Sequence, residues 1–215
     1  MPTTIYVSTA AQLEDAFAKA SDGDTIALNA GTYGAARLVG RSFAKDVTIT
    51  SADPNARAVL TDDLVVNKVT NLKIEGIDLD ATVLSRFNDN RVDISNSEGI
   101  TLSDMLIEGR LPRAREGVDP DAPGVRRGDV IAGYGLETGL QVRNVKDVRI
   151  ENVEMRDLRK AVTLLDGEDV VLTGLEVHRV REGINLTDMV RLEIVDNHFH
   201  DFRPWNPSAS GDHPD

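Results

Sequence analysis

Hydrophobic residues recur every 22 positions through the last third of the chain. Val148, Val170 and Leu192 show this spacing, and the same step relates further sets: Ile150, Leu172 and Ile194; Leu140, Val162 and Ile184; Val142, Leu164 and Leu186. Fixed self-similarity at a period of about 20–50 residues is typical of a solenoid. Within each unit hydrophobic and polar residues alternate, which is the periodicity of a strand and not of a helix. The pattern predicts an all-β parallel β-helix with three short strands in each turn of about 22 residues.

The first residues follow a different pattern, which predicts a helical cap. Thr9-x-x-Gln12 has the form of a capping box, and Leu13, Ala16 and Phe17 would share one face of a helix over about 10–20. Such an amphipathic helix covers the open end of a solenoid core. We therefore expect a single domain over 1–215, with the cap and first strands in 1–35, solenoid turns in 36–202 and the start of a further loop in 203–215.

Alignment of the turns separates a constant corner from a corner that accepts insertions. The corner between the second and third strands is two residues long, and it ends on Gly, Asn or Asp in every turn: Gly76, Asp104, Asn152, Gly174 and Asp196. The linker from the third strand to the first strand of the next turn is short in the regular turns, but it extends over 108–139 and lengthens again from Asp201. Because long loops on one corner of a solenoid usually mark the binding face, we expect the functional site at the third-to-first corner.

Charge and composition exclude several classes of function. The formal net charge of −12 argues against a nucleic-acid partner, which needs clustered Lys and Arg. The chain has no cysteine, so disulfides and thiolate metal sites are excluded. No apolar run reaches the ~18 residues that span a bilayer, and the N-terminus has no ordinary secretory signal. The acidic balance suits a protein kept soluble by repulsion or one that works with calcium. The oligomeric state stays open.

The N-terminal residues resemble a known group of proteins. The run Val7-Ser-Thr-Ala-Ala-Gln-Leu13, then Gly23-Asp-Thr-Ile26 and Gly31-Thr-Tyr33, is similar to the start of secreted polysaccharide-modifying β-helices in the pectate-lyase-like superfamily. These include polysaccharide lyase family 6, with chondroitinase B and the alginate lyases, and the alginate C5-epimerase modules. The resemblance implies a right-handed, single-stranded β-helix that acts on an acidic (uronate) polysaccharide such as alginate, by β-elimination or C5 epimerisation.

The C-terminal residues add calcium and location to this resemblance. The segments 198–202 and 211–215 are similar to bacterial β-helix proteins that often have calcium-binding nonapeptide repeats downstream. The resemblance implies a bacterial, extracellular protein, exported without an ordinary signal peptide, with calcium as the candidate cofactor and no other. The Asp-Pro-His motif of the epimerases is replaced here by Asp212-His-Pro-Asp215, so their catalytic assignment does not transfer. The chain ends where a further strand is due, and we expect it to be an N-terminal fragment.

Removal of a proton next to a carboxylate needs a cation, a base and an acid, and this requirement selects the candidate residues. Arginine suits the carboxylate as a bidentate partner, and histidine suits the proton transfers. The catalytic candidates are His200, Arg203, His213 and Asp215. The candidates for substrate binding come from the outward column of the first strand, from the loop-bearing corner and from the single tryptophan: Gln141, Thr163, Asn185, Arg159, Arg181, His178 and Trp205.

Each candidate also has a purely structural interpretation. The arginine column can pair with nearby carboxylates at a gain of roughly 0–1 kcal/mol each, and the histidines can be polar corner residues. Trp205 can pack on a turn instead of stacking on a sugar. Asp166 and Asp188 are candidate metal ligands by their 22-residue spacing, or they cap N–H groups of the turns. The alternative function is a non-catalytic polysaccharide-binding adhesin or tailspike-like structural module.

Overall fold

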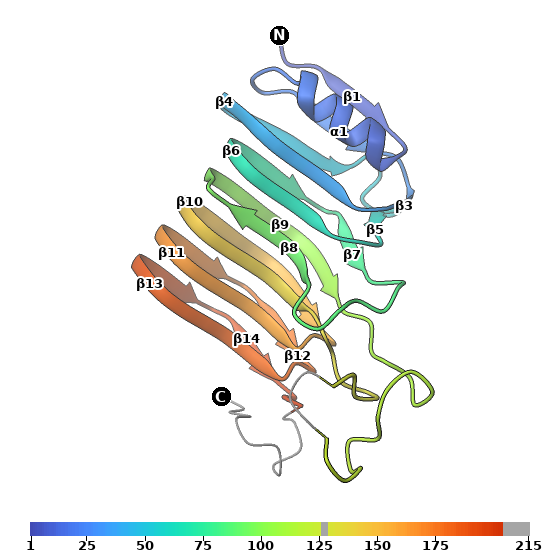
Figure 1. Ribbon diagram of the computed structural model, residues 1–215. Helices are drawn as coiled ribbons and strands as arrows, with labels where there is room; N and C mark the ends of the chain where they lie inside the picture. Colours follow the sequence, from blue (N-terminus) through green and yellow to red (C-terminus); the bar gives the residue numbers. More distant parts are fainter. Residues whose placement is uncertain (126–128, 204–215) are drawn as a thin grey trace.

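The computed structural model describes residues 1–125 and 129–203, which form a parallel β-solenoid. Figure 1 shows the turns stacked in sequence order, from the N-terminal end in blue to the last turn in red. All strand pairings are parallel. The strands are β1 (Thr4–Val7), β2 (Thr25–Leu28), β3 (Gly31–Tyr33), β4 (Ala36–Ser51), β5 (Ala58–Leu60), β6 (Leu64–Glu75), β7 (Asp78–Asp80), β8 (Asn90–Ser95), β9 (Glu98–Glu108), β10 (Thr138–Arg156), β11 (Lys160–Thr173), β12 (Glu176–His178), β13 (Glu182–Val195) and β14 (His198–His200).

The pairing register is the one that the 22-residue repeat predicts. Val170 pairs with Val148 on one side and with Leu192 on the other. Val162 lies in the same way between Leu140 and Ile184. Because successive side chains of a strand point to opposite faces, one register assigns a whole set of residues to the interior. The aligned hydrophobic residues of β10 and β11 are buried accordingly, with an exposed fraction of 0–1% for Leu140, Val142, Val148, Ile150, Val162, Leu164, Val170 and Leu172.

The turns are not divided into three separate short strands. β10 runs without interruption from Thr138 to Arg156, and it contains three residues in the left-handed conformation. These are Asn144, Asp147 and Asn152, with φ of 51°, 50° and 53°. Asn and Asp tolerate positive φ better than other residues with a Cβ, so the chain can turn sharply while the ladder of hydrogen bonds continues. The sequence predicts one such corner, and the structure has three within this strand.

The same conformation repeats at equivalent positions of neighbouring turns. Positive φ occurs at each member of three columns: Asn96, Asn144, Asp166 and Asp188; Gly99, Asp147, Asp169 and Arg191; Asp104, Asn152, Gly174 and Asp196. This explains the regular spacing of Asp166 and Asp188 in conformational terms, because each marks a bend in its strand. Both side chains are exposed. Their predicted role as metal ligands stays a prediction.

The predicted N-terminal helix is confirmed as α1 (Ala10–Lys19), and Figure 1 shows it at one end of the stack beside β1. The hydroxyl of Thr9 accepts a hydrogen bond from the Gln12 amide at 3.2 Å, as expected of an N-cap. Leu13, Ala16 and Phe17 are buried, and the Phe17 ring packs edge-on against Phe43 of β4 at 5.7 Å. The helix therefore covers the core of the first turns. It is too short and too polar to cross a membrane, and it is the one helix among the described residues.

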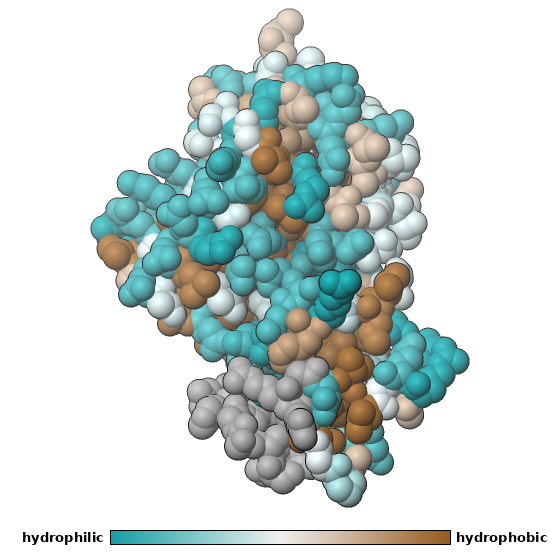
Figure 2. Space-filling model, in the orientation of Figure 1, coloured by the Kyte–Doolittle hydropathy of each residue, from teal (hydrophilic) through white to brown (hydrophobic). Residues whose placement is uncertain are grey.

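The core is more exposed at the other end of the described chain. Leu164 of β11 is fully buried, whereas its partner in β13, Leu186, is 45% exposed. Ile194 is 41% exposed, although it pairs with the fully buried Leu172. Figure 2 shows hydrophobic surface near this end, beside the residues drawn in grey. The last described turn thus presents inward-pointing positions that are sealed in the turns before it. The predicted domain boundaries and the fragment expectation are not tested by this observation.

The connection between β9 and β10 is the long loop that the sequence places at the third-to-first corner. Its described part, drawn in green to yellow, projects from the side of the stack in Figure 1. The amide of Val118 donates to the carbonyl of Val130 at 2.8 Å, and Val118 forms an isolated parallel bridge with Ile131. A second connection at the same corner, between β7 and β8, spans residues 81–89. The two loops concentrate irregular backbone on one corner.

Candidate functional site

The predicted site residues fall into three groups in the structure. Trp205, His213 and Asp215 lie outside the described residues, so their roles stay predictions. Arg203 follows β14, and its guanidinium lies 4.0 Å from the carboxylate of Asp157. The remaining candidates lie on the first-strand surface, at the third-to-first corner, or on the outward face of β12 and β14.

Arg159 and Arg181 lie at the predicted corner, but they are interior residues. Their exposed fractions are 4% and 5%. The Arg159 guanidinium lies 3.2 Å from the Glu182 carboxylate and 5.0 Å from the centre of the Phe87 ring, which comes from the β7–β8 connection. The Arg181 amide donates to the Arg159 carbonyl at 3.2 Å, so the two residues are stacked one turn apart. Neither guanidinium forms part of the surface, and we leave both out of the proposed binding surface.

The predicted outward column of the first strand is present. Thr163 pairs with Gln141 on one side and with Asn185 on the other, and all three are partly exposed. The column continues to Asp93, whose carboxylate accepts a hydrogen bond from the Gln141 amide nitrogen at 3.4 Å. The Asn185 amide donates to Glu182 at 3.1 Å. These polar side chains form an ordered strip beside the loop-bearing corner, and their role in binding stays a prediction.

A pocket of about 260 Å³ lies at this corner, formed by two consecutive connections. The link between β5 and β6 contributes Thr61, Asp62 and Asp63, and the link between β7 and β8 contributes Val83, Leu84, Ser85, Arg86 and Asp89. Arg91 of β8 forms part of its wall. The sequence predicts this corner but none of these residues. Alignment of the turns could have related two of them. Asp63 directly precedes Leu64 and Arg91 directly precedes Val92. Because Leu64 and Val92 pair in the ladder, the two charged residues occupy the same position in consecutive turns.

The electrostatics of this pocket are unusual at Asp63. Burial raises the pKa of Asp63 to about 6, and the neighbouring carboxylates of Asp62, Asp89 and Glu137 act in the same direction. The Arg91 guanidinium opposes them and lowers the pKa, with Nη1 at 3.6 Å from Oδ1 of Asp63. The Asp63 side chain is 41% exposed and can be reached from solvent. A carboxyl group with this pKa titrates close to neutral pH, which is the range suited to a general base or acid.

Two buried groups support the pocket from inside. Arg91 is 1% exposed, and its Nε and Nη2 have no hydrogen-bond partner among the described residues. Glu137 is fully buried, and burial raises the pKa of its carboxyl group. The Glu137 carbonyl accepts hydrogen bonds from the amides of Arg159 and Lys160 at 2.8 and 3.2 Å. The long loop is thereby anchored where β10 begins, next to the pocket.

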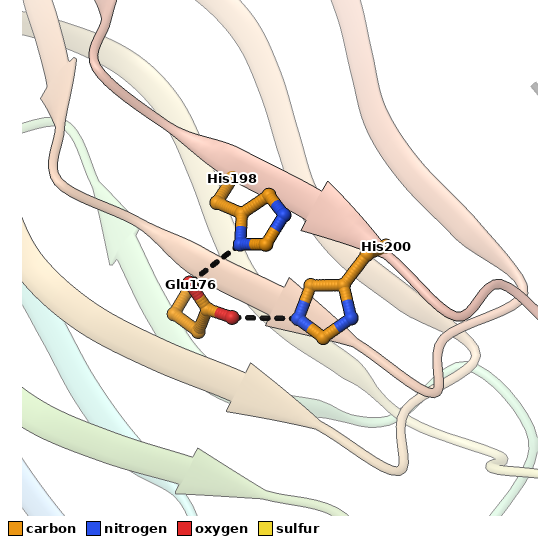
Figure 3. Close-up of side chains that lie close together, drawn as sticks. All are labelled: Glu176, His198 and His200. Carbon is orange, nitrogen blue, oxygen red and sulfur yellow. Dashed lines mark hydrogen bonds and ion pairs between the residues drawn. The ribbon is translucent and has the colours of Figure 1, made fainter.

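Histidines gather on a different surface, the outward face of β12 and β14. Here Glu176 lies between His198 and His200, and Figure 3 shows both rings directed at its carboxylate. His198 Nδ1 lies 3.2 Å from one carboxylate oxygen and His200 Nε2 lies 2.6 Å from the other. The Glu176 carboxylate, and after it Asp201, raise the pKa of His200. We call Glu176, His198 and His200 the histidine cluster.

His178 lies beside the histidine cluster, on the same strand as Glu176. Its ring stacks on His200 with 5.1 Å between the centres and 7° between the planes. His178 Nε2 lies 3.1 Å from the Glu154 carboxylate. The sequence predicts roles for His178 and His200, and the structure places them side by side. It does not predict His198 or Glu176, although these two are themselves 22 residues apart and pair in the ladder.

A third feature is a groove of about 660 Å³ along the outward faces of β10, β11 and β13. Three exposed cations line it: Lys146, Arg149 and Arg191. Carboxylates alternate with them, and the Arg191 guanidinium lies 2.5 Å from Asp169. Positive and negative side chains therefore nearly balance one another along the groove.

Comparison with known proteins adds two similar structures. No protein-family model matches the chain, and no curated protein matches it in sequence. The crystal structure of an alginate lyase from Paenibacillus sp. str. FPU-7 matches with a TM-score of 0.42 and 15% identity, covering 91% of this chain and 75% of that one. The PL6 family alginate lyase AlyGC matches with a TM-score of 0.37 and 14% identity, covering 92% of this chain and 40% of that one. Both similar structures are alginate lyases, and the second is described as a member of the PL6 family.

Proposed function

We propose that the chain is a carbohydrate-active β-helix that acts on an acidic, uronate polysaccharide such as alginate, by β-elimination or C5 epimerisation. The observation that supports this proposal is the corner pocket, in which Asp63 has a pKa of about 6 beside guanidinium groups. Both reactions begin with removal of the C5 proton next to a carboxylate, and both need a base that is ionised at neutral pH together with a nearby cation.

Asp63 is the proposed base. Above pH 6 its carboxylate is ionised, and its partial exposure lets it accept a proton from a bound sugar. In β-elimination the electrons of the broken C5–H bond form a C4–C5 double bond, while the glycosidic C4–O bond breaks and the leaving oxygen takes a proton. In epimerisation a proton returns to C5 from the opposite side of the ring. Arg91 is a positioning residue in this scheme, because its buried guanidinium contacts Asp63.

Arg86 is the proposed partner of the sugar carboxylate. It lines the same pocket on the β7–β8 connection and is exposed. A guanidinium can bind a carboxylate through two parallel hydrogen bonds and withdraw charge from it as the proton leaves. The pocket volume of 260 Å³ is just below the ~300 Å³ of ordinary small-molecule sites, which suits one sugar unit of a longer chain.

Several expectations from the resemblances of the N-terminal and C-terminal residues accompany this proposal. We expect the β-helix to be right-handed with three sheets, and the protein to be bacterial and extracellular, with calcium as its candidate cofactor. His200 and Arg203 remain proposed catalytic groups, on and just after β14, and neither is among the residues that line the corner pocket.

A non-catalytic polysaccharide-binding module is the second candidate function. The groove along β10, β11 and β13 favours it, because the exposed side chains of Lys146, Arg149 and Arg191 present positive charge along its lining. Such a surface can bind a charged polymer without changing it.

Incubation with alginate and other uronate polymers, with calcium present, tests the proposal. A lyase would release unsaturated uronates that absorb in the ultraviolet, and an epimerase would change the uronate stereochemistry seen by NMR. Arg86→Gln should raise KM, whereas Arg149→Gln in the groove should leave turnover unchanged. Binding without turnover that is lost in Arg149→Gln would support the second candidate and overturn the first.

A further inference from the structure

We propose that Glu176, His198 and His200 form a binding site for a divalent transition metal of the zinc type. The proposal does not depend on the corner pocket or on the role of Asp63 as a base. It also differs in kind from a calcium site, because calcium prefers six to eight oxygen ligands and imidazole nitrogen suits zinc, nickel and copper.

The backbone fixes the three ligands before any metal binds. His198 and His200 are two residues apart on β14, so the strand periodicity places both side chains on its outward face. The ladder pairs Glu176 of β12 with His198 directly, and His200 with His178. The ligand set therefore depends on two adjacent strands in a defined register and not on a mobile loop.

The distances fit a small tetrahedral ion. The ligand atoms of all three residues lie within 4.8 Å of one another. An ion about 2.0–2.2 Å from each donor separates neighbouring donors by roughly 3.3–3.6 Å. Glu176 already lies 3.2 Å from His198 Nδ1 and 2.6 Å from His200 Nε2, so slight opening of the cluster admits an ion. Figure 3 shows the carboxylate between the two rings, where such an ion would be shared.

The groups around the cluster match those that usually surround a metal site. A ligating histidine commonly donates its other ring nitrogen to a carboxylate, which orients the ring. His200 has this arrangement, because its Nδ1 lies 3.0 Å from the Asp201 carboxylate while Nε2 faces Glu176. His178 stacks on the His200 ring, and its own Nε2 lies 3.1 Å from the Glu154 carboxylate. Two His ligands and one carboxylate leave a fourth position of the ion open to water.

The cluster brings the ligands of two neighbouring turns to one centre. The rings of His198 and His200 are stacked with 4.4 Å between their centres, and one divalent ion would neutralise the Glu176 carboxylate between them. Because the cluster joins β12 to β14, a bound ion would also tie the last described turn to the one before it.

Calorimetric titration of the full chain with zinc chloride, and with calcium chloride as a comparison, tests the site. We expect about one equivalent of zinc to bind, with His198→Gln and His200→Gln each weakening zinc by more than about tenfold. His178→Gln is the matched control, since His178 is a neighbouring histidine that is not a ligand, and it should retain zinc binding. Cobalt in place of zinc should give visible absorption bands that are lost in His200→Gln.

Three outcomes would overturn the proposal: wild-type protein that binds neither zinc nor cobalt, binding that survives both ligand substitutions, and binding abolished equally by His178→Gln. His198 is 68% exposed, so its substitution should leave the fold intact. Far-ultraviolet circular dichroism of each variant checks this. If His198→Gln did unfold the chain, Glu176→Gln would provide the same test from the neighbouring strand.

Discussion

The guanidinium of Arg91 lies 3.6 Å from the carboxylate of Asp63, and the two residues occupy the same position in consecutive turns of the solenoid. Arg91 is almost fully buried, whereas Asp63 reaches solvent. The contact links the interior of the stack to the pocket at its loop-bearing corner. Burial, and after it the surrounding carboxylates, outweigh this one cation, so the pKa of Asp63 stays raised.

The first prediction concerns stability and pH. The pKa of Asp63 is about 6 in the folded chain and about 3.9 in an unfolded one, so between pH 4 and pH 6 the folded state binds more protons. The contribution of this group to the free energy of unfolding therefore falls as pH rises from about 4 to about 6. Urea unfolding of the wild type and of Asp63→Asn should be compared across this range. As pH rises, the free energy of unfolding of the wild type relative to the variant should fall or change sign. The exposed Asp46→Asn should show no such trend.

The second prediction concerns Arg91 as a buried cation. Arg91→Met leaves the Asp63 and Glu137 carboxyl groups without their facing positive charge, and should lower the free energy of unfolding by about 1–3 kcal/mol. This is less than the 3–5 kcal/mol of a fully buried pair, because Asp63 is partly exposed. Arg86→Met, an exposed arginine of the same pocket, should change stability by less than about 0.5 kcal/mol. Equal losses in the two variants would contradict the structural role of Arg91.

The third prediction concerns the left-handed corners. Asp147 lies inside β10 with φ of 50° and an exposed side chain. Asp147→Gly and Asp147→Asn should be tolerated within about 0.5 kcal/mol, whereas Asp147→Val should cost about 1–2 kcal/mol because a β-branched residue is strained at positive φ. Chemical denaturation measures all three. A valine variant as stable as the asparagine variant would show that the bend is not needed.

The fourth prediction compares two paired leucines. Leu164 and Leu186 occupy the same position in adjacent turns, but their exposed fractions are 0% and 45%. Leu164→Ala should cost about 2–5 kcal/mol, and Leu186→Ala less than about 1 kcal/mol. If the two costs were similar, Leu186 would have to be covered in solution, for instance by a second copy, which sedimentation can detect.

The regular features of this fold could be read from the sequence because they repeat by simple translation. A 22-residue step and a two-residue alternation assigned Val148, Val170 and Leu192 to one inward column. The structure pairs them in that register, with Val148 and Val170 fully buried and Leu192 partly buried. The capping helix was predictable for a different reason, since Thr9 and Gln12 form a local motif that needs no tertiary context.

The features that could not be predicted from the sequence depend on tertiary packing and on backbone conformation. Asp63 and Arg91 occupy the same position in the aligned turns, but the sequence does not show that Arg91 is buried against the Asp63 carboxylate. Arg159 looked like a surface residue because it is charged, but Phe87 and Glu182 from other turns enclose it. The long strands were missed because Asn and Asp, which usually mark turns, bend the chain here without interrupting the ladder.

The measurement that tests the central proposal most directly is the pH dependence of uronate turnover by wild type, Asp63→Asn and the control Asp46→Asn. With Asp63 as the base, kcat/KM of the wild type should fall about tenfold per pH unit below pH 6 and level off above it. Asp63→Asn should be slower by about 10²–10⁴ and lose that limb, while Asp46→Asn matches the wild type. A wild-type level of turnover in Asp63→Asn, with the limb near pH 6 intact, would contradict the proposal.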